Sequence, residues 1–217
     1  MLHCVPILSL PQEFDQKVKK QSSYLFETSF VSSSSGSCYA SYHDCKVLAS
    51  VHGPLMTQNK GFDSDTCSLE CEVKYSSSSS DSDNQMTSRE RQLAEYIKDS
   101  LASSIRLSLY PKSTIFLSVL IMEDSTQDDL AVAINTSSLA LIDSGVELYD
   151  IVTASCYTNK HHSTHITIAE MTKLNEVTML VSEGQIYDDF TECLNTCQAE
   201  CRDIRSLFDK HIISHEA

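Results

Sequence analysis

This 217-residue sequence lacks several features that direct a chain to a particular class of protein. It has no tryptophan, and its 5 glycines and 4 prolines are too few for an all-β protein built on many tight turns. No apolar run approaches the roughly 20 residues that a membrane-spanning helix needs. There is also no C-x-x-C pair, P-loop, G-x-G-x-x-G or G-x-S-x-G motif, which removes the signatures of common zinc, nucleotide and serine-hydrolase sites.

Basic residues are also in short supply, with 16 lysines and arginines against 30 aspartates and glutamates. The resulting formal charge of −14 should repel nucleic-acid backbones unless the few cations are clustered. We therefore expect this chain, on its own, to bind RNA poorly. Its length is sufficient for a substantial buried core, in one large domain or two small ones.

Residues 1–21 are predicted to form an irregular N-terminal extension. Its short apolar stretch, residues 5–10, has no basic residue before it and no small-residue cleavage pattern after it, unlike a secretory signal. We therefore expect an intracellular protein whose nine cysteines are reduced thiols.

The N-terminal part of the remaining chain is predicted to form strands. Apolar positions from Tyr24 to Val31 predict the first, and residues 38–42 and 46–51 predict two more, with Gly53-Pro54 ending the last of them. Apolar residues then alternate over residues 67–75, which is the period of a half-buried strand. Residues 76–86 begin with serines and aspartates that cannot build a core, so we interpret them as a flexible loop.

Helices and strands alternate in the rest of the chain. Apolar residues recur every four positions from Leu93 to Ile105 and predict a helix that begins near Thr87 or Ser88 and stops before Pro111. The later elements are predicted over residues 114–122 (strand), 128–144 (helix), 149–157, 164–170 and 176–182 (strands), and 188–213 (helix). This order predicts one α+β domain over residues 22–217.

The helix predicted over residues 128–144 has clear signals at both ends. Ser125 with Asp128, or Thr126 with Asp129, resembles a capping box. Gly145 is a natural residue to follow the last turn. Carboxylates at a helix start also favour the helix dipole, so capping is preferred to a magnesium site for the aspartates between 124 and 129.

Cysteines and histidines form two groups of residue types that can bind a metal ion. Three cysteines recur every four residues from Cys193 to Cys201, in line with apolar side chains, so we interpret them as core residues in preference to zinc ligands. Three histidines cluster between His161 and His165 with no acidic residue or cysteine nearby, which favours an exposed loop. No metal or cofactor is predicted.

Several segments together resemble the RNase PH-like subunits of the eukaryotic RNA exosome ring. GSCYASYHDCKVLASVHGP (36–54) resembles the family's opening hairpin. RERQLAEYIKDSL (89–101), IRLSLYPK (105–112) and AVAINTSSLALIDS (131–144) resemble its first helix, the exit from that helix and its small-residue helix. SGVELYDIVTA (144–154) is the sharpest match, similar to the A-G-V-E-M-Y-D-L-V signature of the mRNA-transport-regulator-type subunit, the exosome component six class.

This resemblance implies a single α+β RNase PH-like domain (ribosomal protein S5 domain 2-like), with mixed sheets packed against helices. It implies a heterodimer with another RNase PH-like chain within a six-membered ring, S1/KH cap proteins, a processive 3′→5′ exoribonuclease and RNA passing through the complex, with no membrane partner. It also implies roles in rRNA maturation, RNA surveillance and mRNA turnover, in the nucleus, nucleolus and cytoplasm.

The resemblance also locates the place where active relatives carry out phosphorolysis, the attack of phosphate on the 3′-terminal phosphodiester. There, glycine, hydroxyl and arginine groups before the second helix hold the phosphate, whereas residues 123–129 (EDSTQDD) contain four carboxylates and neither glycine nor arginine. Active relatives place an aspartate pair in the segment that corresponds to residues 158–165 (TNKHHSTH), which has no carboxylate. Because carboxylates repel phosphate, we predict no catalytic residues.

The prediction is therefore a non-catalytic structural subunit of the ring. Arg89 and Arg91 fall near the family's RNA-backbone arginines and are the predicted RNA-binding residues; the alternative is that both are solvated positions at a helix start. An active phosphorolytic 3′→5′ exoribonuclease, a small metal-binding adaptor and a sibling RNase PH-like ring subunit remain as alternatives.

Overall fold

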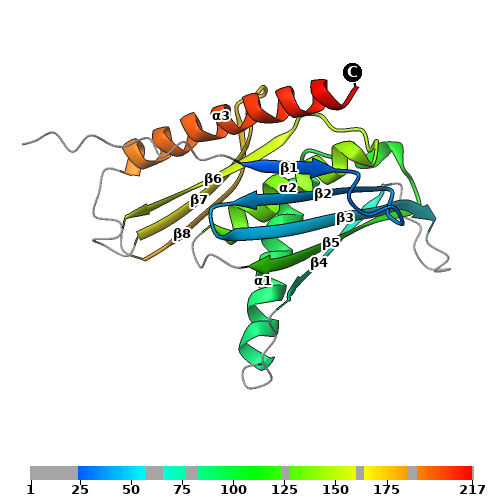
Figure 1. Ribbon diagram of the computed structural model, residues 1–217, viewed down its shortest axis with the longest axis horizontal. Coiled ribbons are helices and arrows are strands. Elements are labelled where there is room, and N and C mark those ends of the chain that lie inside the picture. Colours follow the sequence, from blue (N-terminus) through cyan, green and yellow to red (C-terminus); the bar gives the residue numbers. More distant parts are fainter. Residues whose placement is uncertain are drawn as a thin grey trace, which may run out of the picture.

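The computed structural model describes residues 24–56, 66–76, 83–123, 128–159, 164–184 and 190–216. Over this part of the chain, two β-sheets pack with three α-helices (Figure 1). The predicted N-terminal extension, residues 1–21, lies outside the described residues, as do residues 77–82 of the predicted serine-rich loop. No helix among the described residues is long and apolar enough to cross a lipid bilayer.

The larger sheet has five strands in the order β1-β2-β3-β5-β4. They are β1 (Leu25–Thr28), β2 (Gly36–Tyr42), β3 (Cys45–Met56), β4 (Ser68–Tyr75) and β5 (Ser113–Glu123). Pairing is antiparallel except between β4 and β5, which run parallel. A parallel pair needs a crossover connection, and it is made by α1 (Asp83–Ala102) followed by a short 3-10 helix (Leu107–Leu109).

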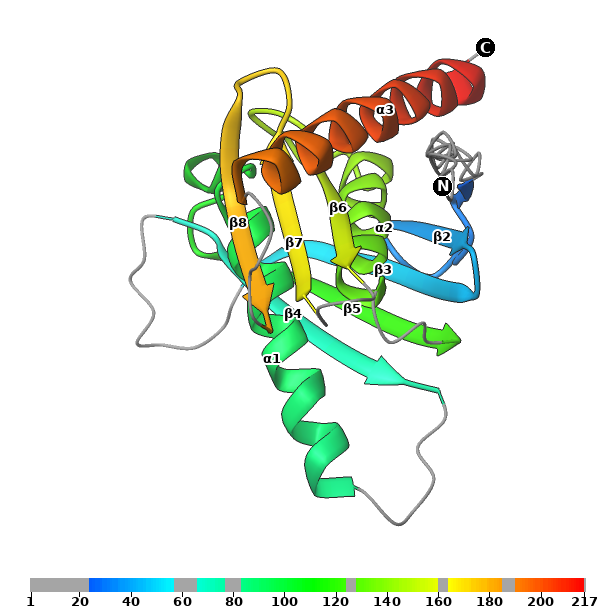
Figure 2. The ribbon, with the colours of Figure 1, turned by 90° about the vertical axis from the view of Figure 1, so that its left-hand side faces the viewer.

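The smaller sheet is antiparallel, with β6 (Val152–Asn159), β7 (Thr164–Met171) and β8 (Glu176–Glu183) in chain order. The C-terminal helix α3 (Phe190–Glu216) packs on one face of this sheet, against β6 and β7 (Figure 2). The other face meets α1 and α2 (Asp129–Asp143). The smaller sheet is therefore the middle layer between α3 and the other two helices.

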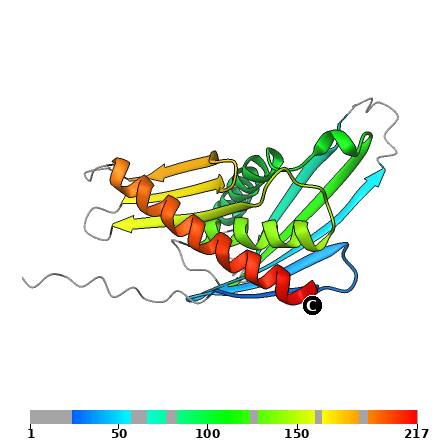
Figure 3. The same cartoon turned by 90° about the horizontal axis from the view of Figure 1, so that it is seen from above.

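Helix α2 lies between the two sheets and is the centre of the core (Figure 3). Every residue from Asp129 to Leu141 is buried, and its many alanines and serines allow strands to approach on both sides. Two of its buried polar side chains, Asn135 and Ser138, are paired with β6. The Asn135 amide exchanges two 2.8 Å hydrogen bonds with the backbone of Ala154, and the Ser138 hydroxyl donates to the Val152 carbonyl at 2.7 Å. These bonds fix the helix against the strand.

Several predicted features are confirmed. Residues Leu93, Ile97 and Leu101 are buried along one side of α1. Residue 145 has a positive φ of 71°, and its amide donates to the Ile142 carbonyl at 3.0 Å, as expected for a glycine after the last turn of a helix.

The element boundaries that differ most from the prediction are the end of β3 and the start of α1. Strand β3 does not end at Gly53-Pro54 but continues to Met56, because a register shift against β5 between His52 and Leu55 accommodates the proline in the strand. Helix α1 begins at Asp83, so the end of the loop predicted over residues 76–86 is helical. The apolar stripe that marked this helix begins only at Leu93, which is why its first turns were missed.

The capping prediction for α2 is wrong for Asp128. This residue precedes the helix but makes no side-chain capping bond. Its carboxylate instead lies 2.7 Å from the Cys156 thiol of β6. Ser125 and Thr126 lie outside the described residues.

The cysteines of α3 are core residues, as predicted. Cys193, Cys197 and Cys201 are at most 4% exposed, and the Cys201 sulfur lies 3.4 Å from the Ser155 hydroxyl of β6. Burial raises the pKa of Cys197 to about 11 and that of Cys201 to about 12, so both remain neutral thiols at physiological pH. Within the described ranges, no group of three or more histidine, cysteine or acidic side chains is placed to hold a metal ion.

Candidate functional site

A pocket of about 500 Å³ opens where the middle of α1 and the start of α2 meet β7 and β8. Both segments that the sequence singled out reach it, since Asp129 is the last residue of the 123–129 segment and His165 is the last residue of the 158–165 segment. Its polar lining comes from all four elements: Ser88, Arg89, Gln92, Tyr96, Asp129, His165, Thr167 and Glu183.

The Asp129 carboxylate is the most enclosed charged group of this pocket, with its side chain 3% exposed. Its Oδ2 atom lies 3.2 Å from an Arg89 guanidinium nitrogen and accepts a hydrogen bond from the Tyr75 hydroxyl at 3.3 Å. Its Oδ1 atom lies 3.7 Å from the Cys45 sulfur. Donors from β3, β4 and α1 therefore converge on this one carboxylate, which offsets the cost of burying its charge.

Arg89 is the arginine of the predicted pair that reaches the pocket. Its guanidinium carbon lies 5.5 Å from the centre of the Tyr75 ring, a cation–π arrangement, while the side chain stays 42% exposed. Arg91 is exposed on α1 and does not line the pocket. The structure thus separates the two residues that the sequence grouped together, and RNA binding by either of them stays a prediction.

His165 is held in the pocket wall by two threonines. The Thr158 hydroxyl lies 3.1 Å from its Nδ1 atom and the Thr167 hydroxyl 3.2 Å from its Nε2 atom. Because a hydroxyl can donate or accept, the two contacts hold the ring in place with either of its nitrogens as the donor. His161 and His162 lie outside the described residues.

Glu183 supplies a carboxylate that the sequence reading missed. It lies directly opposite His165 in the register of β7 and β8 and lines the pocket. The strand predicted over residues 176–182 stops one residue before it, and only strand pairing brings it to the site. Gln92 and Tyr96 of α1 were also missed. Gln92 is exposed and Tyr96 is half-buried, and nothing in the local sequence around them indicates that they line a pocket.

The neighbouring Asp128 faces a different group of residues. One of its oxygens lies 2.7 Å from the Cys156 sulfur and the other 3.8 Å from His43 Nδ1. Burial, with the nearby Asp128 charge, raises the pKa of the Cys156 thiol, which makes it a poor nucleophile. The two consecutive aspartates are thus separated, and only Asp129 belongs to the pocket.

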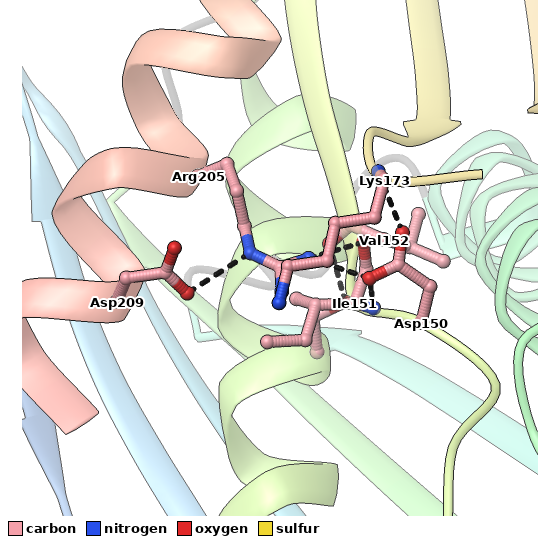
Figure 4. Close-up of polar contacts among 7 residues, drawn as sticks. Asp150, Ile151, Val152, Lys173, Arg205 and Asp209 are labelled. Atoms are coloured by element: carbon pink, nitrogen blue, oxygen red, sulfur yellow. Dashed lines mark hydrogen bonds and ion pairs between the residues drawn. The ribbon is translucent and has the colours of Figure 1, made fainter. Parts of the chain in front are cut away.

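The segment that resembles the V-E-M-Y-D-L-V signature has a structural role (Figure 4). Asp150 lies 2.7 Å from an Arg205 guanidinium nitrogen of α3, and both side chains are at most 9% exposed. Asp150 also accepts hydrogen bonds from the backbone amides of Ile151 and Lys173, each at 2.8 Å. Burial raises the pKa of Asp150, but the Arg205 hydrogen bond, the two amides and the arginine charge outweigh it and hold the pKa below its ordinary value. This network ties α3 to the start of β6.

Comparison with known families agrees with this architecture. Residues 23–147, more than half of the chain, match the 3′ exoribonuclease family, domain 1 (RNase PH). The chain belongs to the RNase PH family. The resemblance predicted from the sequence is therefore confirmed at the level of the family.

Relatives of this RNase PH chain are named as exosome components. An RRP41-like exosome complex component of Arabidopsis thaliana is 36% identical over 130 residues, covering 60% of this chain and 50% of that protein. Exosome complex component mtr3 of Schizosaccharomyces pombe is 32% identical over 123 residues, which cover 55% of this chain and 48% of that protein. Human (Homo sapiens) exosome complex component MTR3 is 26% identical over 143 residues, which cover 57% of this chain and 52% of that protein. The chain thus spans about half the length of the curated relatives it matches.

Solved structures share the RNase PH fold over most of the chain. Rice (Oryza sativa) Rrp46 superposes with a TM-score of 0.73 at 18% identity, covering 85% of this chain and 92% of the other. A chain of an archaeal exosome core superposes with a TM-score of 0.69 at 14% identity, covering 87% of each. The predicted α+β RNase PH-like fold is confirmed.

Proposed function

We propose that this chain is a non-catalytic structural subunit of the RNA exosome core ring. Its membership of the RNase PH family and its likeness to proteins named exosome complex components support a place in such a ring. Its role there is to complete the ring and to support 3′→5′ RNA processing and degradation that other subunits carry out. The resemblance to the mRNA-transport-regulator type favours that class of subunit over its siblings.

The charges of the residues that line the pocket support the non-catalytic part of this proposal. A phosphorolytic site must hold a phosphate nucleophile beside the RNA backbone, so it needs an excess of positive charge. In the described part of this pocket, the one arginine is paired with a buried aspartate, and Glu183 adds a second carboxylate. Such a lining favours cations over phosphate. The absence of glycine and arginine from residues 123–129 agrees with it.

The proposed partners follow from the ring. They are other RNase PH-like chains, one of which forms a heterodimer with this subunit, together with S1/KH cap proteins and a processive 3′→5′ exoribonuclease. The net charge of −14 fits this role, because basic neighbours can supply most of the RNA contacts. We propose the nucleus, nucleolus and cytoplasm as its locations, and rRNA maturation, RNA surveillance and mRNA turnover as the processes it supports.

Affinity purification of the tagged full chain, followed by mass spectrometry, tests ring membership. We expect five other RNase PH-like chains and the cap proteins to co-purify. A lone monomer would contradict the proposal, and stoichiometric zinc in the purified chain would favour a metal-binding adaptor. RNA degradation that depends on both phosphate and this subunit would favour the active exoribonuclease.

A further inference from the structure

We infer that Asp129 acts as an internal anion that fills a phosphate-sized binding position and keeps inorganic phosphate out of the pocket. This inference rests on the proposed non-catalytic function, because it names one side chain as the reason why the pocket does not bind phosphate. The groups that surround Asp129 would then form an anion site whose occupant is part of the chain. Removing the charge of this one side chain should therefore allow the pocket to bind phosphate.

The groups around Asp129 are those that an anion requires. A guanidinium group from Arg89 and a hydroxyl from Tyr75 converge on one carboxylate oxygen, at 3.2 Å and 3.3 Å. The side chain also lies in the first turn of α2, where the helix dipole favours negative charge. These donors come from three separate elements, so the fold and not the local sequence assembles them.

The position differs from an ordinary structural ion pair, and the chain offers one for comparison. The Asp150–Arg205 pair is closed to solvent, with side chains 4% and 9% exposed. In the Asp129–Arg89 pair the carboxylate is equally enclosed, but the arginine is 42% exposed and borders a cavity of about 500 Å³. A small ion can therefore reach the Arg89 guanidinium from solvent, whereas it cannot reach Arg205.

The internal carboxylate opposes phosphate in two ways. It uses the hydrogen bonds of Arg89 and Tyr75 that an incoming phosphate would need. It also places a negative charge within a few ångströms of that phosphate, in a partly buried site where like charges repel strongly. Removing the charge at position 129 removes both effects while the donors stay in place.

The test is the substitution Asp129→Asn in the full chain, with phosphate binding followed by ³¹P NMR and by the shift in Tm on adding inorganic phosphate. We expect the wild-type chain to show no saturable binding and the variant to bind phosphate at least about tenfold more tightly, since one nearby like charge is removed. Asp128→Asn is the matched control: it removes the adjacent carboxylate, which contacts Cys156 and His43 and not Arg89, and should leave phosphate binding unchanged.

The double variant Asp129→Asn, Arg89→Gln should lose the binding that the single variant gains. Asp129→Ser repeats the test with a smaller side chain. Two wild-type measurements do not depend on the folding of a variant: saturable phosphate binding, or a phosphate-dependent change in the NMR signals of the Arg89 side chain, would each overturn the inference. A folded Asp129→Asn or Asp129→Ser chain with no gain in phosphate binding would overturn it as well.

These outcomes are distinct from failure of the proposed function. If the chain fails to co-purify with ring subunits, ring membership is wrong, while the gain of phosphate binding in Asp129→Asn can still be measured on the isolated chain. If instead the chain enters the ring but Asp129→Asn gains nothing, the proposed function stands and the internal anion is wrong.

Discussion

An alanine in place of Gly36 is expected to destabilise the fold by about 3 kcal/mol or more, which lowers Tm by roughly 6–12 °C in a chain of this size. Residue 36 begins β2 where the strand meets the C-terminal end of α2. A Cβ atom there would lie 2.2 Å from the Ser144 nitrogen and 2.6 Å from the Ala140 carbonyl oxygen. These are backbone atoms, so the helix end must move away from the strand. Thermal denaturation measured by circular dichroism provides the test.

Gly145→Ala is the control for this prediction. Its φ is positive, but a Cβ atom there would meet nothing within 4 Å. The cost is then backbone strain alone, about 1 kcal/mol. If Gly36→Ala destabilises the chain no more than Gly145→Ala does, the close approach of β2 and α2 does not limit the fold and the prediction is wrong.

Replacing Arg205 with methionine is expected to destabilise the chain by about 3–5 kcal/mol, because it leaves the buried Asp150 carboxylate without its charged partner. The change in free energy of unfolding can be measured by urea denaturation at pH 7. Asp209→Asn is the matched control: this carboxylate also contacts Arg205, at 3.1 Å, but is 47% exposed. An exposed pair at this helical spacing contributes about 0.5 kcal/mol or less.

The same pair predicts a pH dependence. The pKa of Asp150 in the folded chain lies below its ordinary value, so its ionised form stabilises the fold above pH 4 or so and that stabilisation is lost as the pH falls through the folded pKa. In Arg205→Met, the arginine no longer offsets burial and the folded pKa of Asp150 rises. The stability difference between wild type and variant should therefore shrink as the pH falls from the raised folded pKa of the variant to the lowered folded pKa of the wild type. A difference that is constant down to pH 3 would contradict this origin.

The sequence predicted what depends on local periodicity. The stripe that begins at Leu93 and the β-branched run at residues 114–122 each encode one buried face, so their elements were found with small errors at the ends. The cysteines of α3 follow the same rule, because their spacing alone places them on the apolar side of a helix. The RNase PH-like fold was predicted from the segments that resemble the family's motifs.

The candidate site could be predicted only in part, because its contacts are long-range. The sequence located the 123–129 segment and Arg89, but it did not predict that the buried Asp129 carboxylate pairs with an arginine 40 residues away. Glu183 reaches the pocket only through its register opposite His165. Arg205 and Asp150, 55 residues apart, carried no signal of their pairing. Strand register and side-chain direction after a turn are set by the whole fold.

The measurement that most directly tests the central claim is phosphate-dependent release of nucleoside diphosphates from labelled RNA by the purified ring complex. One preparation carries the wild-type chain and the other the chain with His165→Gln and Glu183→Gln, two side chains in the pocket wall that can transfer protons. If the pocket is silent, the two complexes release nucleoside diphosphates equally, whatever other subunits contribute. Release by the wild-type complex that is lost with the variant chain would show that this pocket is a working phosphorolytic site and would contradict the account.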